Sequence, residues 1–114
     1  MAKGKYLGDF EQLVMLAVMR LGEDAYGMTV RREIEARSER RVSLGAIYAT
    51  LDRLEGKGLV SSALAETTPE RRGRAKRFFK VQASGVHALR NALAALDRMR
   101  KGIKGLDRPL GAES

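Results

Sequence analysis

Three short stretches of apolar residues at helical spacing, separated by only a few polar residues, dominate the first half of this chain. In the first stretch, Asp9 is the predicted N-cap, Gln12 stands in the capping-box position and Gly22 ends the run. The apolar positions between them are Phe10, Leu13, Val14, Ala17, Val18 and Leu21. Amphipathic helices in such close succession favour a small helical core.

The second stretch predicts a helix that begins near Tyr26 and ends near Arg37. Its apolar stripe consists of Tyr26, Val30 and Ile34, each four residues from the next. The residues at 38–41 are polar and predict a loop. Val42 then predicts a short extended segment before the next helix.

The third stretch has signals at both of its ends. Ser43 is the predicted N-cap, and Gly58 is the predicted left-handed residue that stops the helix. The apolar positions between them are Leu44, Ile47, Leu51 and Leu54. A third helix is therefore expected between Ser43 and Gly58.

The second half of the chain predicts a β-hairpin and then a long helix. The runs at 59–64 and 77–81 have extended character and flank a loop that contains Pro and Gly. Ser84 is the predicted N-cap of a helix over 85–101, which would be roughly 25 Å long. Its apolar stripe consists of Val86, Leu89, Leu93, Leu96, Met99 and Ile103. This stripe is longer than one domain's core needs, so it predicts a contact with a partner helix.

Composition excludes several classes of function. A chain of 114 residues accommodates one domain of ordinary size. It has no cysteine and a single histidine, His87, which rules out disulfides, thiolate metal sites and a cysteine nucleophile. No apolar stretch approaches the roughly 20 residues that cross a bilayer, so we expect a cytoplasmic protein without a membrane partner. No nucleophile and base pattern and no phosphate-binding glycine pattern occurs, so we predict no enzyme activity, cofactor or metal.

The charge is unevenly distributed. The net charge of the chain is +8, which makes a polyanion such as nucleic acid a candidate partner. Residues 65–80 hold six cations and two carboxylates, a net charge of +4 and half of the total excess. These cations surround the tip of the predicted hairpin, where Arg71, Arg72 and Arg74 could neutralise phosphates.

The third predicted helix has an unusual face opposite its apolar stripe. This face consists of Gly45, Ala46, Ala49, Arg53 and Gly56. Small side chains let a helix backbone approach base edges in a major groove, and Arg53 could reach a guanine or a phosphate. Tyr48 and Thr50 flank the face, and the Tyr48 hydroxyl could donate to a phosphate. The competing interpretation is an inconspicuous helix surface with a tyrosine at the edge of the core.

Taken together, these segments resemble the PadR family of bacterial winged helix-turn-helix transcriptional regulators. The resemblance rests on Tyr26-Gly27, the run from Val42 to Glu55, Lys57-Gly58-Leu59-Val60 and the basic run at 72–79, and it covers about residues 7–100. It implies a mainly α fold of the α+β winged-helix type: a three-helix core, a hairpin wing and a long C-terminal dimerisation helix. Many relatives have Pro where this chain has Ala49, so base preference does not transfer.

The resemblance implies a division of the chain. Residues 1–82 would form the DNA-binding domain, 83–104 the C-terminal dimerisation helix and 105–114 a disordered tail. The implied DNA-binding residues are Ser43, Gly45, Ala46, Tyr48, Ala49, Thr50, Arg53, Arg71, Arg72, Arg74 and Lys76. The implied dimerisation residues are Val86, Leu89, Leu93, Leu96, Met99 and Ile103.

The function implied by the resemblance is that of a repressor that binds an inverted-repeat operator in double-stranded DNA as a homodimer. A small-molecule effector near the dimer interface stays open, although a tryptophan-lined pocket is excluded because the chain has no Trp. Two alternatives also stay open: an architectural DNA binder without sequence preference, and an adaptor that uses the winged helix to contact another protein.

Overall fold

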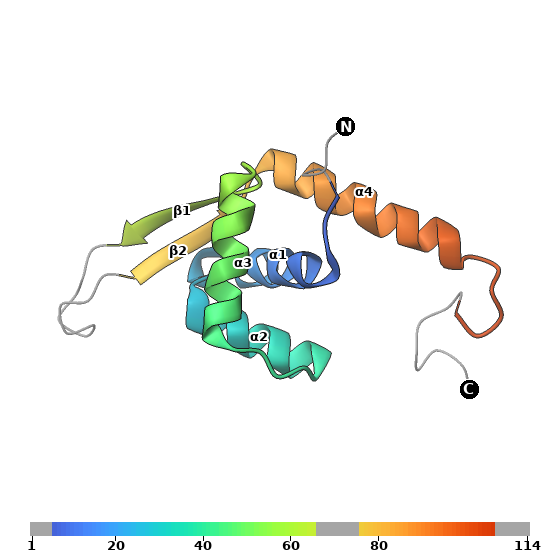
Figure 1. Cartoon of the computed structure of the whole chain (residues 1–114), viewed down its shortest axis with the longest axis horizontal. Helices are drawn as coiled ribbons and strands as arrows, with labels where there is room; N and C mark the ends of the chain where they lie inside the picture. The colour runs from blue at the N-terminus through green and yellow to red at the C-terminus, as the bar shows by residue number, and fades with distance from the viewer. Residues whose placement is uncertain (1–5, 66–75, 107–114) are drawn as a thin grey trace.

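Three helices, a β-hairpin and a fourth helix follow one another in the order expected from the sequence. The computed structural model describes residues 6–65 and 76–106 (Figure 1). The first three helices are α1 (Asp9–Leu21), α2 (Gly27–Ser38) and α3 (Leu44–Gly56), and a short 3-10 turn, η2 (Gly22–Asp24), joins the first two. The winged-helix fold class is thereby confirmed, with the hairpin as its wing.

The core lies where α1, α2 and α3 meet. Their apolar stripes face one another because residues three and four apart share one side of a helix. The largest side chains that are fully buried are Met15, Ile47, Leu51, Leu54, Val14, Val18 and Val30. At about 1.5–3 kcal/mol for each large aliphatic side chain, this burial is the main force that fixes α3 against the other two helices.

The wing is an antiparallel pair of strands, β1 (Val60–Ala65) and β2 (Lys76–Val81). Val60 pairs with Val81, and Ala65 pairs with Lys76. The amide of Phe79 in β2 donates to the carbonyl of Ala25 at 2.8 Å, which attaches the hairpin to the segment between α1 and α2. The wing is thus held against the helical core at its base.

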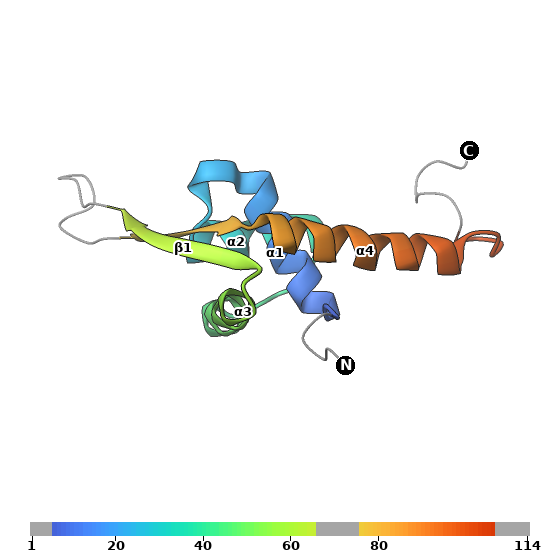
Figure 2. The same cartoon turned by 90° about the horizontal axis from the view of Figure 1, so that it is seen from above.

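The fourth helix, α4 (Ala83–Arg100), leaves the core on the side away from the wing. Figure 1 and Figure 2 show the wing and the far end of α4 projecting in opposite directions from the three-helix core. Leu89 is buried in the core and Leu93 packs against it, whereas the large apolar residues after Leu93 are exposed. The first half of α4 therefore belongs to the domain and the second half extends beyond it.

The helix boundaries show where the cap predictions succeed and where they are wrong. Ser43 caps α3 as expected, since its Oγ accepts from the Ala46 amide at 3.0 Å, and Gly58 has a left-handed φ of 77°. The cap of α1 is Gly8 instead of Asp9, and Glu11 accepts from the Gly8 amide in the role expected of Gln12. Glu11 sits at the third helical position, from which a side chain can reach back to the cap amide.

The predicted cap of the last helix is also wrong, whereas the helix ends within one residue of the expected position 101. Gln82 is the N-cap of α4, and the hydroxyl of Ser84 instead donates to the carbonyl of Gly58 at 2.8 Å. The helix ends at Arg100, and Gly102 and Gly105, which were expected to break it, have left-handed backbone angles. Ile103 consequently lies in the turns after the helix. The predicted disordered tail lies outside the described residues except for residues 105 and 106, which form part of these turns.

Candidate nucleic-acid interface

The exposed face of α3 is built from small residues in its first half. Gly45, Ala46 and Ala49 are all exposed, and a β carbon added at Gly45 would meet no atom within 4 Å. The apolar stripe on the other side holds the helix in the core, so this face points away from the domain. A surface of this kind can approach the floor of a DNA groove closely.

Thr50 does not belong to that face. Its residue is only 3% exposed, and its hydroxyl oxygen accepts from the terminal nitrogen of Arg53 at 3.4 Å. The expectation that Thr50 is positioned to contact DNA is therefore wrong. Successive residues of a helix point in different directions, so Thr50 lies on another side of α3 than Ala49. It lies beside Leu51, on the side that packs against the core.

Tyr48 lies at the junction of α3 and α2. A β carbon added at Gly27, the first residue of α2, would come within 2.3 Å of the Tyr48 hydroxyl oxygen and 2.4 Å of the ring carbon that bears it. Only a residue without a side chain allows this approach. The ring of Tyr48 is half-buried, and its hydroxyl is held beside the N-terminus of α2. This position favours anions because the first amides of a helix lack partners within the helix.

Arg53 is held by a carboxylate from α1. Glu11 is 6% exposed, and its Oε2 accepts from Arg53 Nε and from Lys57 Nζ, both at 3.0 Å. Burial acts to raise the pKa of Glu11, but the Gly8 amide, Lys57 and Arg53 together outweigh it, and the pKa lies below its ordinary value of 4.5. The Arg53 side chain remains 52% exposed. One cation of the candidate interface is therefore also a structural link between α1 and α3.

A second ionic link joins the wing to α3. Arg77 of β2 lies 3.0 Å from Asp52 and 2.6 Å from Glu55, and its Nε donates to Ser62 at 3.1 Å. Burial acts to lower the pKa of Arg77, but hydrogen bonds and charge attraction from Glu55 and Asp52 raise it above its ordinary value. In the sequence Arg77 belongs to the basic run at 72–79, yet its charge is neutralised within the domain. Its effect is to set the position of the wing relative to α3.

The first residue of β2, Lys76, lies beside two aromatic rings, at the end of the strands away from the Val60–Val81 pair. Lys76 Nζ lies 4.0 Å from the centre of the Tyr26 ring, and Tyr26 packs edge-on against Phe78 with 5.3 Å between ring centres. The cation is thus attracted to the aromatic face and placed close to the start of α2. The other wing residues expected to bind DNA, Arg71, Arg72 and Arg74, lie outside the described residues.

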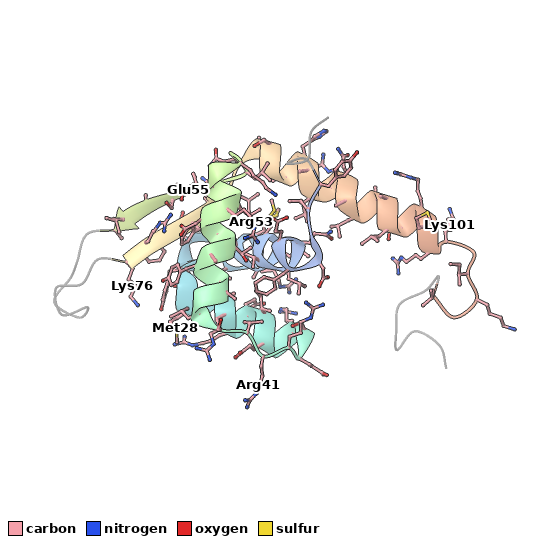
Figure 3. The ribbon with its side chains drawn as sticks, in the orientation of Figure 1. Met28, Arg41, Arg53, Glu55, Lys76 and Lys101 are labelled. Atoms are coloured by element: carbon pink, nitrogen blue, oxygen red, sulfur yellow. The ribbon has the colours of Figure 1, made fainter. Side chains whose placement is uncertain are left out.

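Arg41 is a candidate contact that the sequence interpretation missed. It is exposed and lies two residues before the Ser43 cap, and its charge is one of the causes that lower the pKa of Glu35. Figure 3 shows Arg41 and Lys76 projecting on the same side of the molecule, near the start of α3, whereas Arg53 lies further along α3 beside α1. A cation directly before the cap of a candidate recognition helix is the signal that could have identified it.

The residues expected to form a dimer interface divide into two groups. Leu89 is buried in the core of its own chain, so its assignment to a partner contact is wrong; it lies on the part of α4 that covers α1 and β2. Val86 and Leu93 are half-buried. Leu96, Met99 and Ile103 are 55%, 75% and 47% exposed, so their apolar surface is available for a partner.

Within residues 6–65 and 76–106, no helix combines the length and hydropathy that a membrane span requires. In the same part of the chain, no three His, Cys, Asp or Glu side chains gather in a way that could hold a metal ion.

The sequence matches one family model, described as the transcriptional regulator PadR-like family, over residues 15–91. This match covers more than half of the chain and includes α2, α3, the wing and the first half of α4. No curated protein sequence matches the chain significantly.

Several solved structures share the fold. A PadR-like transcription factor from Bacteroides fragilis matches with a TM-score of 0.68 and 22% identity, over 79% of this chain and 82% of that chain. A PadR family transcription regulator from Clostridium difficile R20291 matches with a TM-score of 0.66 and 18% identity, over 81% and 92% of the two chains. A PadR family regulator from Eggerthella lenta DSM 2243 matches with a TM-score of 0.62 and 24% identity, over 77% and 74%. At these identities the structures establish a common fold.

Proposed function

Because this chain belongs to the PadR-like family of transcriptional regulators, we propose that it is a cytoplasmic repressor that binds an inverted-repeat operator in double-stranded DNA as a homodimer. The observation that carries the proposal is the surface at the start of α3. There the small residues Gly45, Ala46 and Ala49 are exposed, and the cations Arg41 and Lys76 lie on the same side of the domain.

The proposed contacts divide by their chemistry. The exposed face of α3 reads base edges, with Ala49 against a thymine methyl and Arg53 toward a base or a phosphate. The DNA backbone is contacted by Ser43, Tyr48, Arg41 and Lys76, and these contacts fix the orientation of α3. Arg71, Arg72 and Arg74 of the wing add affinity that does not depend on sequence, because each neutralised phosphate releases counterions.

The proposed dimer uses the exposed part of the stripe on α4. Leu96, Met99 and Ile103, with the half-buried Leu93 and Val86, would pack against a second copy of the helix. A two-fold dimer of this kind presents two copies of α3, so the operator is expected to have half-sites about one helical turn apart, roughly 34 Å. An effector, if one acts on the protein, would bind near this interface.

A binding experiment with DNA from the chain's own upstream region tests the proposal. A palindromic segment of that region is compared with a scrambled segment of the same length and composition, at several salt concentrations. Preference for the palindrome with a stoichiometry of two chains per site supports the proposal. If the protein binds both segments with equal affinity, it is an architectural binder. If it does not bind DNA and instead captures a protein partner at high salt, it is an adaptor. Either result contradicts the proposal.

A further inference from the structure

Glu11 of α1 is a buried carboxylate whose position is fixed by donors from two separate parts of the domain. Its Oε1 accepts from the amide of Gly8, the N-cap of α1, at 2.8 Å. Its Oε2 accepts from Arg53 of α3 and from Lys57, the C-cap of α3, both at 3.0 Å. A buried polar group whose hydrogen bonds are satisfied has one well-defined position. Glu11 is therefore a fixed acceptor between α1 and α3.

One edge of the Arg53 guanidinium faces the protein. Its Nε donates to Glu11, and its Nη2 lies 3.4 Å from the hydroxyl oxygen of Thr50. The side chain is nevertheless 52% exposed, and Figure 3 shows it beside α3, toward α1. Because a guanidinium is a planar fork of N–H groups, Nη1 and the second N–H of Nη2 are left for a partner outside the domain. Two such donors match the O6 and N7 acceptors of a guanine in the major groove.

The charges around Arg53 orient it without neutralising it. Arg53 and Lys57 share the single carboxylate of Glu11, so these three side chains together keep a positive charge. Arg77 is in the opposite situation, because it lies between the two carboxylates of Asp52 and Glu55. Arg53 thus combines a fixed position with a charge that still attracts DNA.

We propose that Glu11 is a positioning residue for base recognition: it holds Arg53 so that the terminal N–H groups donate to a guanine at one base pair of each half-site. This inference rests on the proposed function and adds to it a residue that does not touch DNA. An unrestrained arginine loses rotamer freedom when it binds, and this loss weakens binding. A guanidinium already held at Nε loses less freedom, and a wrong base at that position finds the donors unable to move toward it.

A double-mutant cycle on Glu11 and Arg53 tests the proposal. An operator is selected by the natural chain from a pool of random duplexes, and affinities are measured for it and for each of its single base-pair changes. Arg53→Ala identifies the base pair that Arg53 recognises. We expect Glu11→Gln to lose about fivefold of the discrimination at this same base pair. In the double variant the loss should be no greater than in Arg53→Ala, because the two residues act through one contact.

Glu33→Gln is the matched control. Glu33 of α2 also accepts from two arginines, from Arg20 Nε at 3.3 Å and from Arg37 Nε, and neither of these belongs to the proposed interface. Both substitutions remove one negative charge and strengthen binding to all DNA, so the ratio between operators is compared. The control should keep its full discrimination at every base pair.

A second variant guards against loss of folding. Glu11→Asp keeps the charge, but its carboxylate is one methylene further from Arg53, so the same loss of discrimination is expected. Denaturation of each variant identifies those that are folded under the assay conditions, and the cycle is measured with these.

The outcomes separate this inference from the proposed function. If the natural chain selects no operator, both fail. If it selects one, but Glu11→Gln and Arg53→Ala affect different base pairs or their losses add in the double variant, Glu11 does not act through Arg53. The inference is then overturned and the proposed function stands. The same holds if Glu33→Gln loses as much discrimination as Glu11→Gln, since the loss then follows from charge or stability.

Discussion

The hydroxyl of Tyr48 on α3 lies so close to Gly27 at the start of α2 that a β carbon on Gly27 would come within 2.3 Å of it. The relationship connects the two helices of the helix-turn-helix unit at the point where the DNA backbone is proposed to bind. It also gives a physical reason why Gly27 and Tyr48 occur together in one sequence.

Gly27→Ala is expected to destabilise the domain by about 1–3 kcal/mol, because the added methyl forces the Tyr48 ring out of its position. The same change is expected to weaken DNA binding, since the hydroxyl moves away from the N-terminus of α2. Chemical denaturation and operator titration measure the two effects. Gly56→Ala is the control, because its added β carbon would meet no atom within 4 Å. Equal stability of the two variants would contradict the close approach.

We expect the Arg53→Ala and Arg41→Ala variants to affect stability and DNA binding in different ways. Arg53 contacts Glu11 at 3.0 Å, so its loss is expected to lower stability and also to reduce discrimination between operator and random DNA by roughly 1–3 kcal/mol. Arg41 acts on the described residues through the attraction between its charge and Glu35, so its loss should weaken binding to all DNA and lower stability less than the loss of Arg53. Denaturation and paired titrations with specific and random DNA measure both. If Arg53→Ala lowers stability alone, Arg53 is a structural residue and does not read DNA.

The stability contributed by Glu11 is expected to depend on pH. Because the pKa of Glu11 is lowered by folding, its contribution is complete above its ordinary value of 4.5 and is lost as the pH falls through the lower folded value. Glu11→Gln should therefore be less stable than the natural chain by about 1–3 kcal/mol at pH 7, with a smaller difference near pH 3. The pKa values of Glu33 and Glu35 are also lowered, but both residues are present in both proteins and their effects cancel in the comparison. A difference that stays constant from pH 7 to pH 3 would contradict the ionic role of Glu11.

The order of elements and the core could be predicted from the sequence because both depend on local spacing. Apolar stripes, the Ser43 cap and the stop at Gly58 are signals contained within one element. The predicted cap of α1 is wrong because Asp9 and Gly8 are both acceptable caps, and the contact that decides between them is made by Glu11. That carboxylate is held in turn by Arg53 and Lys57, more than 40 positions away.

The roles of individual charges could not be predicted for the same reason. Arg77 and Lys76 are neighbours in a basic run, yet Arg77 is paired with Asp52 and Glu55 while Lys76 lies over the Tyr26 ring. Net charge is a property of a segment, whereas neutralisation depends on which carboxylates the fold brings close. Thr50 shows that the exposure of single positions on a helix is also difficult to predict from the sequence. Position 49 of α3 is exposed, whereas Thr50 beside it is buried.

Arg72→Ala and Arg77→Ala are expected to separate binding of DNA from positioning of the wing. If Arg72 neutralises a phosphate, its loss should weaken specific and random DNA alike and reduce the slope of log affinity against log salt by about 1. Arg77 is paired within the domain, so its loss should leave that slope unchanged. It should instead lower stability by about 1–2 kcal/mol, because Asp52 and Glu55 lose their common partner. Salt titrations and denaturation of both variants measure these effects, and a reduced salt slope for Arg77→Ala would show that this residue releases its carboxylates to bind DNA.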